Sequence, residues 1–277
     1  MGNLILEHQR RLILGSKLKH PEVAAYISGL ATPLSGNEIR LLNNLVGSLK
    51  TGLGISNLAD HFDYLNIRAG ETQEQSLRNL AKRAHDSTAV NSPTWTQGEG
   101  FTGNGTSSYV EVDYIPANGN KYQLNDASHG LYLRVFDRGA GTRYNGVYST
   151  TADGANNRIL IGSVDAATLA VGINSGSIGV TDANINGIYV VNRLSNTQYN
   201  WFRNKTKSAN ILTASSKRPD QKILEFGARL PETTVGMYNT SQISFSFAGK
   251  GLTDVQHAAI VDAFEAYMDA KGKGIIA

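Results

Sequence analysis

The spacing of hydrophobic residues changes near residue 90. Between residues 21 and 90, apolar residues recur at intervals of three and four, as they do along one face of an α-helix. Ser35 and Glu38 have the spacing of a capping box, which marks a helix start. The apolar residues that follow on one face are Ile39, Leu42, Leu45, Val46 and Leu49. A second such start, at Thr72 and Gln75, precedes Leu77, Leu80, Ala81 and Ala84. We predict a region of short amphipathic helices over 21–90.

After residue 90 the chain consists of short runs rich in β-branched and aromatic residues, separated by clusters of Gly, Asn, Asp and Ser. These runs predict nine strands, at 109–114, 130–136, 143–149, 158–164, 169–173, 187–193, 199–202, 223–228 and 243–248. Strands do not alternate with helices here, so a parallel doubly wound sheet is not expected. Many short strands at close spacing favour a mainly β protein, an antiparallel β-sandwich or jelly roll.

The last part of the chain predicts one more helix. Thr253 and Gln256 form a third capping box. Polar residues then fall on one side (Asp254, His257, Asp262, Glu265 and Asp269), and apolar residues on the other (Val255, Ala259, Ile260, Ala263, Phe264 and Tyr267). We expect a C-terminal surface helix that packs on a sheet edge or on the N-terminal helices.

Composition narrows the choice of function. The 277 residues include no cysteine, which excludes disulfides, cysteine-ligated zinc and a thiol nucleophile. The first residues lack the long apolar core of a signal peptide, and no apolar run is long enough to cross a bilayer. We therefore expect a protein that is made in the cytoplasm and does not enter a membrane.

The basic charge lies at the N-terminus. The whole chain has a net charge of +3, and the first twenty residues alone reach the same value, with Arg10, Arg11, Lys17 and Lys19 against Glu7. Because these charges alternate with leucine and isoleucine, we interpret residues 1–20 as an arm that docks on an acidic partner surface. A solvated terminus is the alternative. No stripe of basic and aromatic residues follows, so we expect no nucleic-acid binding.

Two carboxylates on one predicted strand are the main candidates for catalysis. Glu111 and Asp113 are two positions apart, so they share one face of a strand. Retaining glycosidases place two carboxyl groups about 5 Å apart. Laminarinase-like glucanases carry a Glu-x-Asp-x-x-Glu strand, whereas Pro116 replaces the third acid here. We therefore expect both carboxylates to face water and assign no catalytic residue. The expected core residues of this strand are Val110, Val112 and Tyr114.

Metal and cofactor sites are not expected either. The six histidines show no metal-ligand spacing, and the Gly-rich run at 98–105 has no lysine and precedes a strand rather than a helix. The Asp- and Asn-containing loops at 151–157 and 181–187 could ligate calcium through oxygen atoms, but they lack a dense set of carboxylates. We interpret them as Asx-turns.

Exposed aromatic rings are the most informative candidates for carbohydrate binding, because a ring stacks on the face of a pyranose. The glycan-contact candidates are Tyr144, Tyr148, Tyr199 and Trp201. Strand alternation places Tyr199 and Trp201 on one face and Phe202 on the other. We expect Trp201 in the core, and Tyr144 or Tyr148 at the surface.

The order of these motifs resembles a known fold family. The stretches "FTGNGTSSYVEVDY" (101–114), "GIYVVNRLSNTQYNWFRNKTK" (187–207) and "ISFSFAGKGLTDVQHAAIVDAFEAYMDA" (243–270) are similar to concanavalin A-like (laminin-G-like) jelly rolls. The lead "HPEVAAYISGLATPLS" (20–35) and the stretch 69–109 look like virion proteins of tailed bacteriophages. The resemblance implies an arm (1–20), a helical region (21–90) and a sandwich with a C-terminal helix (91–277).

The resemblance also implies a function. It predicts a structural component of a phage virion, a head or tail fibre or appendage, whose lectin-like sandwich contacts host-surface glycan without cutting it. Other virion proteins are the expected partners. Because the short helices of 21–90 bury little surface alone, a homo-oligomer is expected, most simply a trimer. The alternatives are a glycan-active hydrolase of the same fold and a spacer that binds no glycan.

Overall fold

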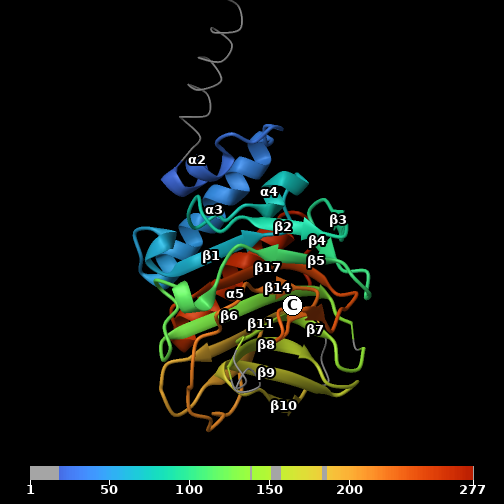
Figure 1. Ribbon diagram of the computed structural model, residues 1–277. Helices are drawn as coiled ribbons and strands as arrows, with labels where there is room; N and C mark the ends of the chain where they lie inside the picture. The colour runs from blue at the N-terminus through green and yellow to red at the C-terminus, as the bar shows by residue number, and fades with distance from the viewer. Residues whose placement is uncertain (1–18, 138, 151–156, 183–185, 277) are drawn as a thin grey trace, which may run out of the picture.

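The computed structural model describes residues 19–137, 139–150, 157–182 and 186–276. Two β-sheets lie face to face, and helices cover the outer side of one of them (Figure 1). Among the described residues, strand pairing is antiparallel except between β15 and β7. The prediction of a mainly β antiparallel sandwich is therefore confirmed.

Each sheet combines strands from distant parts of the chain. Sheet A has the order β13 (Thr206–Lys207), β12 (Asn200–Arg203), β11 (Gly187–Arg193), β6 (Ala127–Val135), β17 (Gln242–Gly249), β4 (Gly100–Thr102) and β3 (Thr94–Thr96), and β1 (Phe62–Ile67) also pairs with β17. Sheet B has the order β10 (Ile178–Thr181), β9 (Thr168–Ser175), β8 (Arg158–Ser163), β7 (Arg143–Tyr148), β14 (Leu224–Glu225), β5 (Tyr109–Val112) and β2 (Ser87–Val90), with the hairpin β15 (Ala228–Arg229) and β16 (Val235–Gly236) beside β7. The helices are α2 (Pro21–Ile27), α3 (Gly36–Leu53), α4 (Gln73–Leu77) and α5 (Asp254–Asp269), with short 3₁₀ turns η1 (Leu58–Asp60) and η2 (Pro116–Asn118).

The main core lies between the two sheets. Alternate residues of each strand point inward, as the period of two requires. On β5 and just beyond it, Val110, Val112 and Tyr114 are buried in this core, as the sequence predicts. Inward-facing residues from β8 and β11, such as Ile159 and Val191, complete the same cluster.

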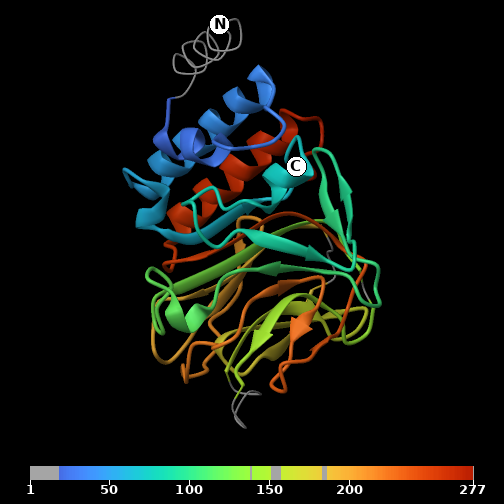
Figure 2. The same ribbon diagram turned by 45° about the horizontal axis from the view of Figure 1, so that its top comes forward.

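A second core lies between sheet A and the helices. In Figure 2, α3 (blue) and α5 (red) lie side by side over the strands. Phe264 of α5 stacks on Phe245 of β17, with ring centroids 4.3 Å apart. The predicted apolar face of α3 is buried in this same layer. Because the chain itself covers that face, the face no longer provides a reason to expect a trimer.

The range 21–90 is not helical throughout. It contributes β1 to sheet A and β2 to sheet B. The helix predicted from Thr72 to Ala84 ends at Leu77. Asn79 explains why the helix ends. Its side-chain oxygen accepts hydrogen bonds from the backbone N–H groups of Leu65 and Ala81, and the bond to Ala81 takes the place of a helical backbone hydrogen bond.

The C-terminal helix forms as predicted, and the Thr253 capping box is present. Its exposed and buried sides differ from the predicted ones. Val255 is 77% exposed, whereas His257 and Glu265 are buried. His257 stacks on Phe202 of sheet A with centroids 4.0 Å apart, and the Tyr132 hydroxyl donates to Glu265 at 2.6 Å. Polar residues on α5 thus pair with groups from the sheet beneath.

Candidate functional site

Three of the four predicted glycan-contact residues are buried. Tyr144, Tyr148 and Tyr199 are 0%, 6% and 1% exposed, so none offers a ring face to a sugar. Their hydroxyl groups are also engaged: Tyr144 donates to the carbonyl of Asp137, and Tyr199 to that of Val171. The expectation that Tyr144 or Tyr148 is the surface ring is wrong.

Trp201 is the partly exposed member of the set, and it packs against the main core at its margin. It lies on β12, next to the edge strand β13 of sheet A. Its ring lies nearly parallel to that of buried Tyr189, with an interplanar angle of 7° and centroids 6.3 Å apart. Its backbone N–H donates to the Ser208 hydroxyl at 3.0 Å. Trp201 is therefore an aromatic surface whose orientation is held by the core.

An ion pair lies at the same edge of the sandwich. Arg203 is two positions after Trp201 on β12, so both side chains leave the same face of the strand. Arg203 Nη1 lies 2.5 Å from the carboxylate of Asp182, which directly follows β10, the edge strand of sheet B. Burial and, to a smaller degree, Asp182 raise the pKa of Tyr189, so this hydroxyl keeps its proton. We call Trp201, Arg203 and Asp182 the edge site.

Glu111 and Asp113 form ion pairs with basic side chains. Lys222 Nζ lies 3.1 Å from Glu111 and 2.8 Å from Asp113, and Arg229 also contacts Glu111. The two carboxylates raise the pKa of Lys222, and the hydrogen bond that Lys222 donates to Asp113 contributes most. Both lie on the side opposite the core, as predicted, although Glu111 is only partly exposed. A carboxylate held by two cations is poorly suited to donate or accept a proton during catalysis.

A buried charge pair escaped the sequence analysis. Arg68 follows β1 at sheet A and Glu225 lies on β14 of sheet B, and both side chains are fully buried. The Arg68 Nη2 donates to Glu225 Oε1 at 2.8 Å, and Ser246 also donates to this carboxylate. Because 157 residues separate the two partners, no local sequence pattern predicts the pair. It joins the two sheets.

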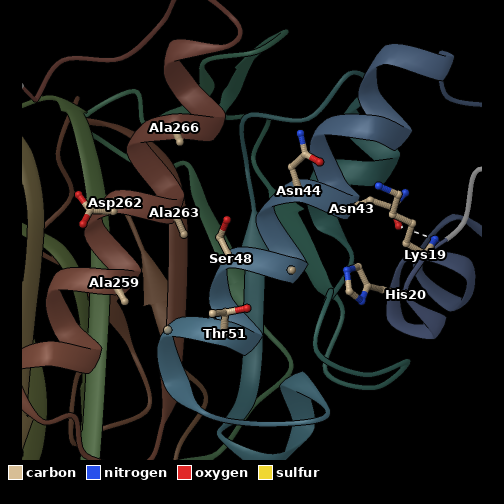
Figure 3. Close-up of a pocket in the computed structure, with 12 residues that line it drawn as sticks. Lys19, His20, Asn43, Asn44, Ser48, Thr51, Ala259, Asp262, Ala263 and Ala266 are labelled. Carbon is tan, nitrogen blue, oxygen red and sulfur yellow. Dashed lines mark hydrogen bonds between the residues drawn. The ribbon is translucent and has the colours of Figure 1, made fainter.

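A groove lies on the helical layer, away from the core of the sandwich (Figure 3). Its volume is about 860 Å³, and it lies between α3 and α5. Figure 3 shows Ser48 and Thr51 of α3 opposite alanines of α5 such as Ala263. A Cβ at Gly52 would collide with Ala259, which shows how closely the two helices approach.

The attachment arm falls mostly outside the described residues. Arg10, Arg11 and Lys17 lie there, so only Lys19 has a described position. Its backbone N–H donates to Asn43 Oδ1 at 2.9 Å, beside the groove (Figure 3). The described end of the arm therefore contacts the helical layer.

No group of three or more His, Cys, Asp or Glu side chains that could hold a metal ion occurs within the described ranges 19–137, 139–150, 157–182 and 186–276. In the same part of the chain, no helix is long and apolar enough to cross a membrane.

No family model and no curated protein matches this chain. Solved structures do. A mutant of Trypanosoma rangeli sialidase displaying trans-sialidase activity has 8% sequence identity and a TM-score of 0.53, and the match covers 86% of this chain and 40% of the sialidase. The botulinum neurotoxin serotype D binding domain has 7% identity and a TM-score of 0.51, with 74% of this chain and 52% of that one covered. The CBM40 domain of Ruminococcus gnavus IT-sialidase, bound to α2,3-sialyllactose, has 13% identity and a TM-score of 0.40 over 50% of this chain and 83% of that one.

At these identities the likeness concerns the fold alone. The fold is a β-sandwich, and the chain spans 40% of the sialidase and 52% of the toxin domain that it matches.

Proposed function

We propose that the protein is a carbohydrate-binding sandwich that contacts glycan at the edge site and does not cut it. The observation that carries the proposal is Trp201, a partly exposed ring held in place by Tyr189. An indole face buries the apolar face of a sugar ring, and the neighbouring pair of Arg203 and Asp182 offers polar groups to sugar hydroxyls. The similarity of the fold to that of a sialidase and of a neurotoxin binding domain supports this proposal.

Binding without hydrolysis follows from the state of the carboxylates. Glu111 and Asp113 share Lys222, and Glu111 contacts Arg229 as well. A glycosidase needs one carboxylic acid and one free carboxylate across the scissile bond. The runner-up function, a glycan hydrolase of the same fold, would require this ion-pair network to open.

We further propose that the protein is a virion component of a tailed bacteriophage. The support is the resemblance of residues 20–35 and 69–109 to such proteins. Residues 1–20 would attach it to other virion proteins, and the contact of the Lys19 backbone N–H with Asn43 of α3 supports an attachment on the side of the helical layer. A homo-oligomer, such as a trimer, would turn weak single-site binding into firm adhesion.

The glycan proposal is tested by displaying the protein in several copies on a bead and probing a glycan array. We expect wild type to bind and Trp201→Ala to lose binding, while circular dichroism shows that the variant remains folded. Tyr109→Ala, a partly exposed aromatic on β5 near the opposite edge of sheet B, is the matched control. Binding that survives in Trp201→Ala would refute the role of the edge site. Mass spectrometry of gradient-purified phage particles tests the virion proposal, which fails if the protein occurs in lysate but never in particles.

A further inference from the structure

The charges along β12, β13 and the turn between them bear on which class of sugar the edge site would accept. Three basic residues lie on β12, β13 and the turn between them, namely Arg203, Lys205 and Lys207. Arg203 shares the strand face of Trp201, whereas the two lysines pair with α5 on the other side of sheet A. Each one has a carboxylate partner: Arg203 pairs with Asp182 at 2.5 Å, Lys205 with Asp262 at 2.5 Å, and Lys207 with Asp254 at 2.8 Å. The formal charges of these six groups cancel.

The three pairs differ in how easily they open. The pairs of Lys205 and Lys207 are exposed, with side chains between 40% and 66% accessible, so water and salt screen them. The pair of Arg203 and Asp182 is different, because the Asp182 carboxylate is only 5% exposed. Separating a buried carboxylate from its cation carries a large desolvation cost. Arg203 therefore stays paired with Asp182.

This stable ion pair affects the binding of charged and uncharged sugars differently. A carboxylated sugar needs a cation to balance its charge, and next to Trp201 it would meet a guanidinium that Asp182 already neutralises, with the buried carboxylate repelling it. An uncharged sugar needs only hydrogen bonds and stacking. The paired guanidinium and carboxylate supply fixed donors and acceptors for hydroxyls, and the Trp201 ring supplies the apolar surface.

We propose that the edge site selects uncharged hexose rings and discriminates against sugars that carry a carboxylate, such as sialic acid or uronic acid. This inference rests on the proposed glycan-binding function and adds the class of ligand. Asp182 acts in it as the residue that sets specificity, since it removes the positive charge that an acidic sugar would require.

The experiment compares matched glycans that differ in one acidic residue, for example lactose-terminated and α2,3-sialyllactose-terminated conjugates, on multivalent wild-type protein. All proteins in this experiment also carry Trp95→Phe, which leaves Trp201 as the chain's single tryptophan. Its fluorescence then reports directly on binding at the edge site. We expect wild type to bind the uncharged conjugate at least tenfold more tightly. Asp182→Asn keeps the shape of the side chain and frees the charge of Arg203, so this preference should shrink or reverse.

The matched control is Asp86→Asn. Asp86 also pairs with an arginine, Arg83 at 3.0 Å, but it adjoins β2, at the opposite edge of sheet B from β10. The control should keep the wild-type preference, and circular dichroism melting shows whether each variant is folded. Equal or tighter binding of the acidic conjugate by wild type would overturn the inference while leaving the glycan-binding function intact. An unchanged preference in folded Asp182→Asn would also overturn it. Absence of binding to every glycan would instead refute the proposed function.

Discussion

Replacing Glu225 with glutamine is expected to destabilise the protein by about 3–5 kcal/mol, because it leaves Arg68 buried without a counter-charge. Both side chains are fully buried. Besides the contact of Nη2 with Oε1 at 2.8 Å, Arg68 Nε donates to Oε2 at 3.0 Å. Glutamine has the shape of glutamate and keeps one carbonyl oxygen, so the substitution removes the charge with little change in packing.

The rest of the network keeps Arg68 in place in the variant. Its Nη1 donates to the carbonyl of Ser76, and its Nη2 also donates to the Ser87 hydroxyl, both at 2.8 Å. The cation therefore stays in the core and cannot reach water. Since a folded domain is stable by only about 5–15 kcal/mol, the loss is a large fraction of the total. At about 2–4 °C per kcal/mol, the melting temperature should fall by about 6–20 °C.

Urea unfolding followed by tryptophan fluorescence and circular dichroism measures the change. Glu111→Gln is the control, because it removes a carboxylate from a surface network and should cost about 1 kcal/mol or less. Replacing both partners, as Arg68→Met with Glu225→Leu, should restore part of the stability. If Glu225→Gln is no more destabilising than Glu111→Gln, the reasoning about the buried pair is wrong.

Acid should weaken the fold, because burial lowers the pKa of His61 and His129 to about 4. The neutral imidazoles contribute their full stabilisation above pH 6.5, and each loses about 2–3 kcal/mol of it as the pH falls towards 4. Equal urea midpoints at pH 7 and pH 4.5 would contradict this. The double variant Glu111→Gln/Asp113→Asn should bind glycan like wild type, whereas a polysaccharide hydrolysis that disappears in it would establish the hydrolase. Deleting residues 1–19 should keep the β-type circular dichroism spectrum and abolish incorporation into particles, and loss of the spectrum would mean that this segment belongs to the core.

The sequence by itself determined the features that depend on neighbours along the chain. The cap at Ser35 forms because its side chain bonds to an N–H three residues later, and the capping box at Thr253 forms for the same reason. The alternation of β5 shows which residues share a face, because that depends only on the pleat. Local spacing was therefore sufficient for α3, for α5 and for the sandwich class.

Only the tertiary structure decided which of two faces is covered, and by what. All six residues of β1 are buried, because the second core lies on its outer side, so β1 lacks the alternation that marks a strand. Tyr148 is buried while Trp201 is partly exposed, although both lie on regular strands. Burial depends on segments that fold over a strand from elsewhere. The edge site combines residues 182, 201 and 203 from two sheets, and such a contact has no counterpart in local spacing.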